Sequence, residues 1–133
     1  IQSVPGIGRS LGLTILYEVD TIERFATVQD FSSFCRLVKG SVASAGKIKG
    51  SRGAKLGNPY LRWAFGEAAV IAKRNHYLLH PYAQRLEAAH GKFKANAILA
   101  NKIARAVYFM LKDKTVFAPE RLIALPSKEK AMA

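Results

Sequence analysis

Apolar residues recur at three- and four-residue spacing in the N-terminal part of this chain. One such stretch covers residues 9–19, and a second covers 27–38. This spacing is typical of helices that bury one face, so we predict a helix over each stretch. Thr21 and Thr27 are candidate N-caps, and Gly40 is the expected end of the second helix.

The same spacing returns after residue 57. Asn58 is followed by Pro59, the residue type preferred at the first position of a helix, so we predict a helix from there to about Lys73. Pro81–Gly91 and residues 93–112 give two more helices. The residues expected to face the core in the first two of these helices are Leu61, Phe65, Ala68, Ala69, Ala72, Tyr82, Leu86 and Ala89.

No strand-type alternation is sustained and no internal repeat is found, so we predict an all-α fold of about five helices. The chain has 133 residues, half of them apolar, which suits one domain with a real core. We place that domain at residues 1–118 and a C-terminal tail at 119–133, where the periodic pattern fades. There is no apolar run long enough for a spanning helix, so no membrane contact is expected.

The net charge of the chain indicates its class of partner more clearly than any motif does. The chain has 21 Lys and Arg against 9 Asp and Glu, a formal net charge of +12. Such an excess favours a polyanionic partner, and DNA or RNA is the usual one. The single Cys35 excludes an intrachain disulfide framework and any multi-cysteine zinc site. A reducing, cytoplasmic location fits this composition.

The first candidate site is the turn Val4-Pro5-Gly6-Ile7-Gly8, which precedes the helix over 9–19. It resembles the hairpin of helix-hairpin-helix DNA-binding motifs. Gly6 and Gly8 would let the backbone approach a phosphate, and the N–H groups at the helix start would favour that anion. The alternative is a simple turn into the helix.

The second candidate is a long loop over residues 39–57, which has five glycines and five basic residues and no acid. A loop of this length is uncommon in a small domain and is usually functional or disordered. We expect its cations and the next arginine to bind phosphates, which would make binding salt-sensitive. These candidate nucleic-acid-binding residues are Lys47, Lys49, Arg52, Lys55 and Arg62. The alternative is a solvated loop without a partner.

Groups that could perform chemistry are sparse. A serine hydroxyl in the loop needs a base or a metal ion for activation, and no Ser-His-Asp arrangement can be identified. His76 and His80 are four residues apart, but Pro81 interrupts the helix, so we do not expect a metal site. Most aromatic residues recur at helical spacing and are expected in the core, except Tyr60, which flanks the basic loop and could stack on a base.

The order of these features resembles the C-terminal domain of the IS110/IS116/IS902 family of insertion-sequence transposases. The resemblance covers about residues 1–118. Its most specific part is Lys55-Leu56-Gly57-Asn58-Pro59-Tyr60-Leu61-Arg62, in order with Val4–Gly8, Ser44-Ala45-Gly46-Lys47 and the helix around Ala100–Tyr108.

The resemblance implies a split enzyme. The family has a RuvC-like nuclease domain N-terminal to this one, with carboxylates that bind a divalent metal such as Mg²⁺. The chain starts with Ile1 and lacks clustered acids, so we expect that domain to be missing here and no cofactor in this one. The resemblance also implies DNA and a structured guide RNA as partners, assembly into homo-oligomers, and a serine that becomes joined to DNA. Ser44 matches that serine best, and Ser41 is the alternate.

Two other functions stay open from the sequence. One is a non-catalytic nucleic-acid-binding module that uses the Val4–Gly8 turn and the basic loop. The other is association with RNA or ribosomes through charge alone.

Overall fold

The computed structural model describes residues 1–37, 57–119 and 121–123, which are helical or irregular and contain no strand. The elements are α1 (Arg9–Val19), the 3₁₀ helix η1 (Ile22–Arg24), α2 (Val28–Phe34), α5 (Pro59–Asn75), α6 (Leu79–His90) and α7 (Lys92–Asp113). The all-α prediction is confirmed. No helix in these described ranges is both long enough and apolar enough to cross a membrane.

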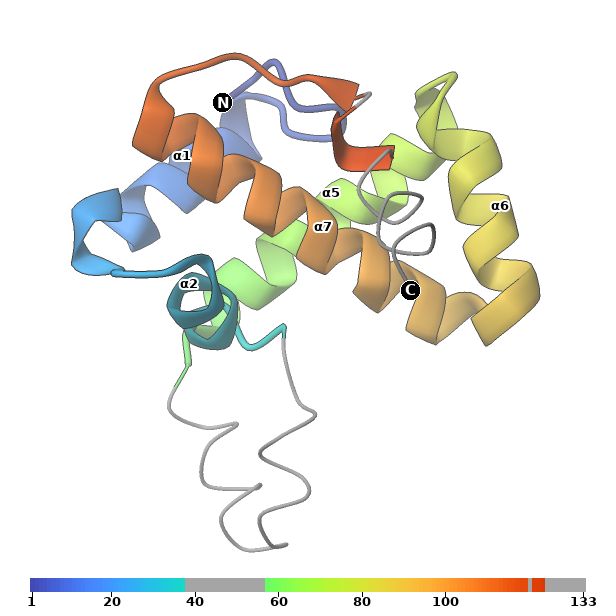
Figure 1. The fold of residues 1–133 in the computed structure, drawn as a ribbon, viewed down its shortest axis with the longest axis horizontal. Coiled ribbons are helices and arrows are strands. Elements are labelled where there is room, and N and C mark those ends of the chain that lie inside the picture. The colour runs from blue at the N-terminus through green and yellow to red at the C-terminus, as the bar shows by residue number, and fades with distance from the viewer. Residues whose placement is uncertain (38–56, 120, 124–133) are drawn as a thin grey trace, which may run out of the picture.

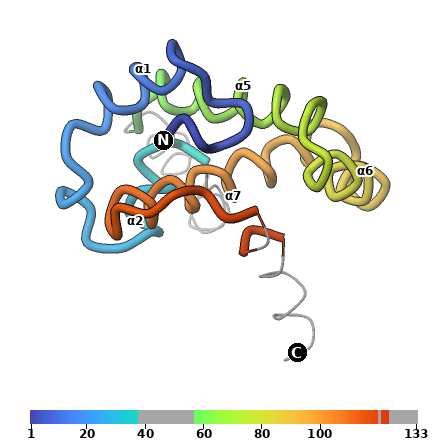
Figure 2. Tube along the Cα trace, turned by 90° about the horizontal axis from the view of Figure 1, so that it is seen from above, coloured from blue at the N-terminus to red at the C-terminus, as the bar shows by residue number. Residues whose placement is uncertain are grey.

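Helices α5 and α7 form the centre of the fold. α7 packs against α5, α6 and α2, and α5 also packs against α1 and α6. In Figure 1, α7 crosses in front of α5. In Figure 2, α1 and α5 lie on one side and α7 on the other, with α6 at one end. α5 presents small residues to its neighbours, which allows close helix packing: Ala64, Ala68, Ala69 and Ala72 are fully buried.

Phe31 of α2 links the N-terminal elements to this central pair. Its ring lies 5.2 Å from that of Phe25, 6.2 Å from that of Phe65 on α5 and 5.6 Å from that of Tyr108 on α7. Tyr108 also donates a buried hydrogen bond from its hydroxyl to the carbonyl oxygen of Phe25, at 3.1 Å. Edge-to-face and tilted aromatic pairs of this kind stabilise a core beyond the area that they bury. The short α2 is therefore held by tertiary contacts rather than by its own length.

The predicted end of the second helix was wrong. α2 ends at Phe34 and not at Gly40, because Arg36 takes a left-handed conformation with φ of 60°. The N–H of Leu37 donates to the carbonyl oxygen of Ser32, and that of Arg36 donates to Ser33. This is the Schellman pattern that closes a helix. It occurs here without the usual glycine, so the sequence carried no signal for it.

The start of α6 was also placed too late. The helix begins at Leu79, and Pro81 is its third residue, where no intrahelical N–H bond is needed. The N-cap residue is Leu78, and the His76 Nδ1 accepts hydrogen bonds from the N–H groups of Leu78 and Leu79. Ala89 was expected in the core but is exposed, while the predicted end at Gly91, with φ of 87°, is confirmed.

The chain continues to pack after α7. Leu122 is 5% exposed and belongs to the same core as the helices, although it lies in the predicted tail. The core therefore includes a residue beyond position 118, and the division into a domain and a tail stays a prediction.

Candidate nucleic-acid interface

The N-terminal turn packs against α5 through Gly6. Val4 and Ile7 are buried on either side of it. Gly6 has φ of 87°, and a Cβ there would collide with the carbonyl oxygen of Ala68 and lie 3.1 Å from the amide nitrogen of Ala72. Packing alone therefore requires a glycine at this position. The predicted phosphate contact of Gly6 stays a prediction.

Gly8 has a different environment. It is exposed, it is the N-cap of α1, and no atom lies within 4 Å of the position that its Cβ would occupy. No side chain caps the first N–H groups of α1, and its first turn contains Arg9 and no acid. Exposed N–H groups at a helix start carry partial positive charge and favour an anion. The geometry at Gly8 is therefore compatible with the predicted phosphate contact.

The segment 38–56 leaves and rejoins the described structure at one place. The N–H of Asn58, at the start of α5, donates to the carbonyl oxygen of Phe34, at the end of α2, with a distance of 2.6 Å. Figure 1 shows the two ends below α2, on the side opposite the N-terminal turn. We call Phe34, Arg36, Gly57 and Asn58 the root of the segment.

Gly57 and Arg36 pack tightly in this root. A Cβ at Gly57 would collide with the Arg36 Cγ and lie 2.8 Å from the carbonyl oxygen of Phe34, so no larger residue fits without movement. Arg36 is half-buried, and its Nε has no hydrogen-bond partner within the described ranges. Arg36 is not among the candidate residues predicted from the sequence. Its only signal was being the first cation in the acid-free interval between Asp30 and Glu67.

Asn58 joins three elements at the root. Its Oδ1 accepts hydrogen bonds from the N–H groups of Tyr60 and Leu61, at 2.9 and 3.0 Å, which confirms the predicted N-cap. Its Nδ2 donates to the Glu18 carboxylate on α1 at 2.8 Å. The conformation of the root is thus fixed by one amide side chain that uses both of its polar atoms.

We expect Asn58→Ala to lower the free energy of unfolding by about 1 to 2 kcal/mol, because the helix cap and the bond to Glu18 are both lost. Glu18→Ala removes only the second interaction and should cost less than about 1 kcal/mol. Urea denaturation of both variants measures the difference. Equal stabilities of the two variants would show that the cap contributes nothing.

Exposed aromatic and basic side chains lie next to the root on α5. Tyr60 is 63% exposed and Trp63 is 55% exposed, with Arg62 exposed between them. The exposure expected for Tyr60 is confirmed. The assignment of most aromatics to the core holds for Phe65, Tyr82 and Tyr108, and it is wrong for the exposed Trp63, Tyr77 and Phe109.

The structure does not bring all the described candidate residues together. α1 and α5 run in opposite directions, since Glu18 at the end of α1 contacts Asn58 while Gly6, before α1, contacts Ala68. The 11 residues of α1 span about 16 Å. Gly8 and the root therefore lie at opposite ends of that helix.

Six of the predicted site residues fall outside the described ranges. They are Ser41, Ser44, Lys47, Lys49, Arg52 and Lys55. Their roles stay predictions.

Other side chains with possible chemistry have different roles in the described structure. Burial raises the pKa of the Cys35 thiol to about 12, so at neutral pH the thiol is protonated and is not a nucleophile. Within the described part of the chain, no group of three or more His, Cys, Asp or Glu residues could hold a metal ion. At the far end of α5, the His76 ring contacts the N–H groups of Leu78 and Leu79, and the His80 ring contacts the carbonyl oxygen of Lys73.

Comparison with known proteins adds one match. The sequence model of the family described as "Transposase IS116/IS110/IS902 family" matches residues 1–84, which include the N-terminal turn, α1, α2, the root and α5. No curated protein and no solved structure matches the chain.

Proposed function

The chain belongs to the IS116/IS110/IS902 family of insertion-sequence transposases, and on that basis we propose that it is a C-terminal transposase domain that binds DNA and supplies a serine nucleophile. The observation that carries this proposal is the geometry of the root. The hydrogen bond between Asn58 and Phe34 holds together the two ends of a segment that contains Ser41, Ser44 and an acid-free run of cations.

Charge at the root supports a phosphate-bearing partner. Arg36 is a half-buried cation of the root, and Arg62 is exposed on the first turn of α5. The exposed rings of Tyr60 and Trp63 offer faces for bases. A nucleic acid, which has both phosphates and bases, complements this combination better than a small anion does.

The covalent step that we assign to this chain is attack on a DNA phosphodiester. The Ser44 Oγ forms a bond to phosphorus, the bond from phosphorus to one deoxyribose oxygen breaks, the hydroxyl proton passes to solvent or a base, and the leaving oxygen takes up a proton. Among the described residues, no three His, Cys, Asp or Glu side chains are grouped so that they could hold a metal ion. We assign Mg²⁺ to the RuvC-like domain, and guide RNA and further copies of the protein complete the proposed assembly.

A non-catalytic nucleic-acid-binding module is the second candidate. The observation in its favour is the uncapped start of α1 at exposed Gly8, which could bind a phosphate without any serine chemistry. Substituting Ser41 and Ser44 separates the two functions, because only the first one needs a hydroxyl.

The binding part of the proposal predicts a salt-dependent affinity for DNA. We expect log K for a duplex to fall linearly with log salt concentration between about 50 and 200 mM, and Arg62→Ala to reduce the slope by about 1. Arg74→Ala is a matched control, since Arg74 is exposed at the other end of α5. Fluorescence anisotropy at several salt concentrations measures both slopes. A flat response of the unsubstituted chain would contradict DNA binding, and equal slopes for the two variants would exclude Arg62 from the interface.

A further inference from the structure

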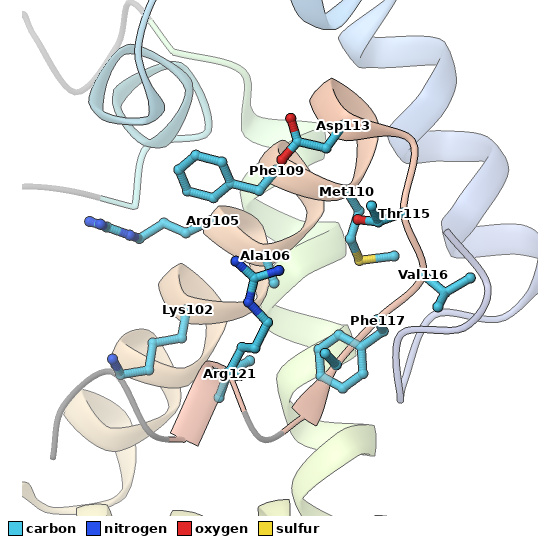
Figure 3. Close-up of a pocket in the computed structure, with 12 residues that line it drawn as sticks. Lys102, Arg105, Ala106, Phe109, Met110, Asp113, Thr115, Val116, Phe117 and Arg121 are labelled. Atoms are coloured by element: carbon cyan, nitrogen blue, oxygen red, sulfur yellow. The ribbon is translucent and has the colours of Figure 1, made fainter. Parts of the chain in front are cut away.

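A pocket of about 390 Å³ opens between α7 and the chain that returns across it (Figure 3). None of its lining residues belongs to the root. A volume of this size falls at the lower end of the range for small-molecule sites, roughly 300 to 1,000 Å³. Its walls are Lys102, Arg105, Ala106, Phe109, Met110 and Asp113 from α7, and Thr115, Val116, Phe117, Ala118, Arg121 and Leu122 from the returning chain.

The returning chain is anchored on both sides of the pocket. Lys114 takes a left-handed conformation after α7, and the N–H of Thr115 donates to the carbonyl oxygen of Met110 at 3.1 Å. The N–H of Phe117 donates to the Ser3 Oγ in the N-terminal turn, at 3.0 Å. Leu122 is buried in the core. The opening between these anchors is therefore a fixed feature of the fold.

The small side chain of Ala106 leaves space for the pocket. It lies one helical turn from Lys102 and about one from Phe109 and Met110, in the middle of the stripe that α7 contributes. In Figure 3 the guanidinium of Arg121 lies close to Ala106. The side chains of Arg105 and Phe109 both extend from α7 toward the left of this view. A larger side chain at Ala106 would point into the space that a ligand needs.

The described lining of the pocket contains more cations than acids. Lys102, Arg105 and Arg121 belong to it, and Asp113 is its one acid among the described residues. Neither Arg105 nor Arg121 forms an ion pair with a carboxylate in the described ranges, where the one ion pair joins Lys73 and Glu87. The Phe109 ring beside them is 47% exposed. Guanidinium groups next to an accessible aromatic face and an apolar wall suit a flat ring that carries an anion.

We propose that this pocket binds an unpaired nucleotide, with the base against Phe109 and the apolar wall and the phosphate at Arg105 and Arg121. The inference rests on the proposed function only in taking a nucleic acid as the partner. It adds a second contact point on α7, selective for a base outside a duplex, because a paired and stacked base cannot enter a pocket of this size. Single-stranded DNA and RNA share this chemistry.

The test compares single strands with a duplex. Labelled oligo-dT, oligo-U and a DNA duplex of the same length are titrated with the full chain and with Ala106→Trp. We expect the substitution to weaken binding of at least one single strand by about tenfold and to leave duplex affinity within about twofold. The strand that is weakened identifies the source of the nucleotide. Ala97→Trp is the matched control, because Ala97 is exposed on α7 and does not line the pocket.

Two milder variants test the same pocket in case Ala106→Trp does not fold. Arg121→Ala changes an exposed residue, and Phe109→Leu keeps an apolar side chain but removes the ring. Each should weaken the same single strand by about fivefold with an unchanged melting temperature. If the unsubstituted chain binds duplex DNA with the expected salt dependence but folded pocket variants bind single strands normally, the pocket inference is overturned and the proposed function stands. If the chain binds none of the three probes, both are overturned.

Discussion

Replacing Gly6 with alanine is expected to lower the free energy of unfolding by about 3 kcal/mol or more, a large part of the roughly 5 to 15 kcal/mol that stabilises a typical domain. Two costs add. The backbone at Gly6 has φ of 87°, where a side chain is strained by about 1 to 2 kcal/mol. The new Cβ also collides with the Ala68 carbonyl oxygen, so the turn or α5 must shift.

Gly8→Ala is the control for this prediction. Gly8 has φ of −88° and open space around the Cβ position, so alanine there should change stability by less than about 0.5 kcal/mol. Thermal and urea unfolding of the two variants measure the contrast. Similar stabilities of Gly6→Ala and the unsubstituted chain would contradict the close packing of the turn against α5.

This contrast also shows that the two glycines of the Val4–Gly8 turn have different roles. From the sequence, Gly6 and Gly8 were equivalent, as glycines that let a backbone approach a phosphate. In the structure, close packing against α5 requires a glycine at position 6, whereas no atom lies near the Cβ position of Gly8. The difference depends on α5, which lies some sixty positions further along the chain, so no local pattern could have revealed it.

Helix boundaries with a local sequence signal were easier to predict than those set by tertiary contacts. Asn58 and Pro59 are local signals, and the cap and first position of α5 agree with them. The end of α2 depends instead on Arg36 in a left-handed conformation beside Gly57, and on the bond from the Asn58 N–H to Phe34. Those contacts are tertiary, and they override the apolar periodicity that continues to Val38.

The aromatic residues were misplaced for a related reason. Spacing alone favours large rings for the core, but α5 buries alanines against its neighbours and leaves Trp63 beside them exposed. The pocket on α7 was missed because half of its wall comes from the chain after Asp113, where the periodic pattern fades. The sequence identifies the residue types of an interface more readily than the faces on which they lie.

The largest functional effect is expected from Ser44→Ala, tested in a protein that joins this chain to the RuvC-like domain that we propose as its partner. Alanine has no hydroxyl, so the bond between serine and phosphorus cannot form, and we expect covalent protein–DNA adduct to fall by at least about 100-fold. DNA affinity should stay within about twofold, since the substitution leaves every cation in place. Denaturing gel electrophoresis of trapped reactions measures the adduct, and anisotropy measures binding.

Ser41→Ala is the matched control, because it removes a hydroxyl from the same acid-free segment, which begins and ends at the root. It should retain the adduct. Loss of adduct in Ser41→Ala alone would move the nucleophile to that residue. Adduct of normal yield in both variants would refute the nucleophile proposal and leave a domain that binds DNA without reacting with it. The two serines are only three residues apart, so a shared effect on binding cannot explain a difference in adduct between them.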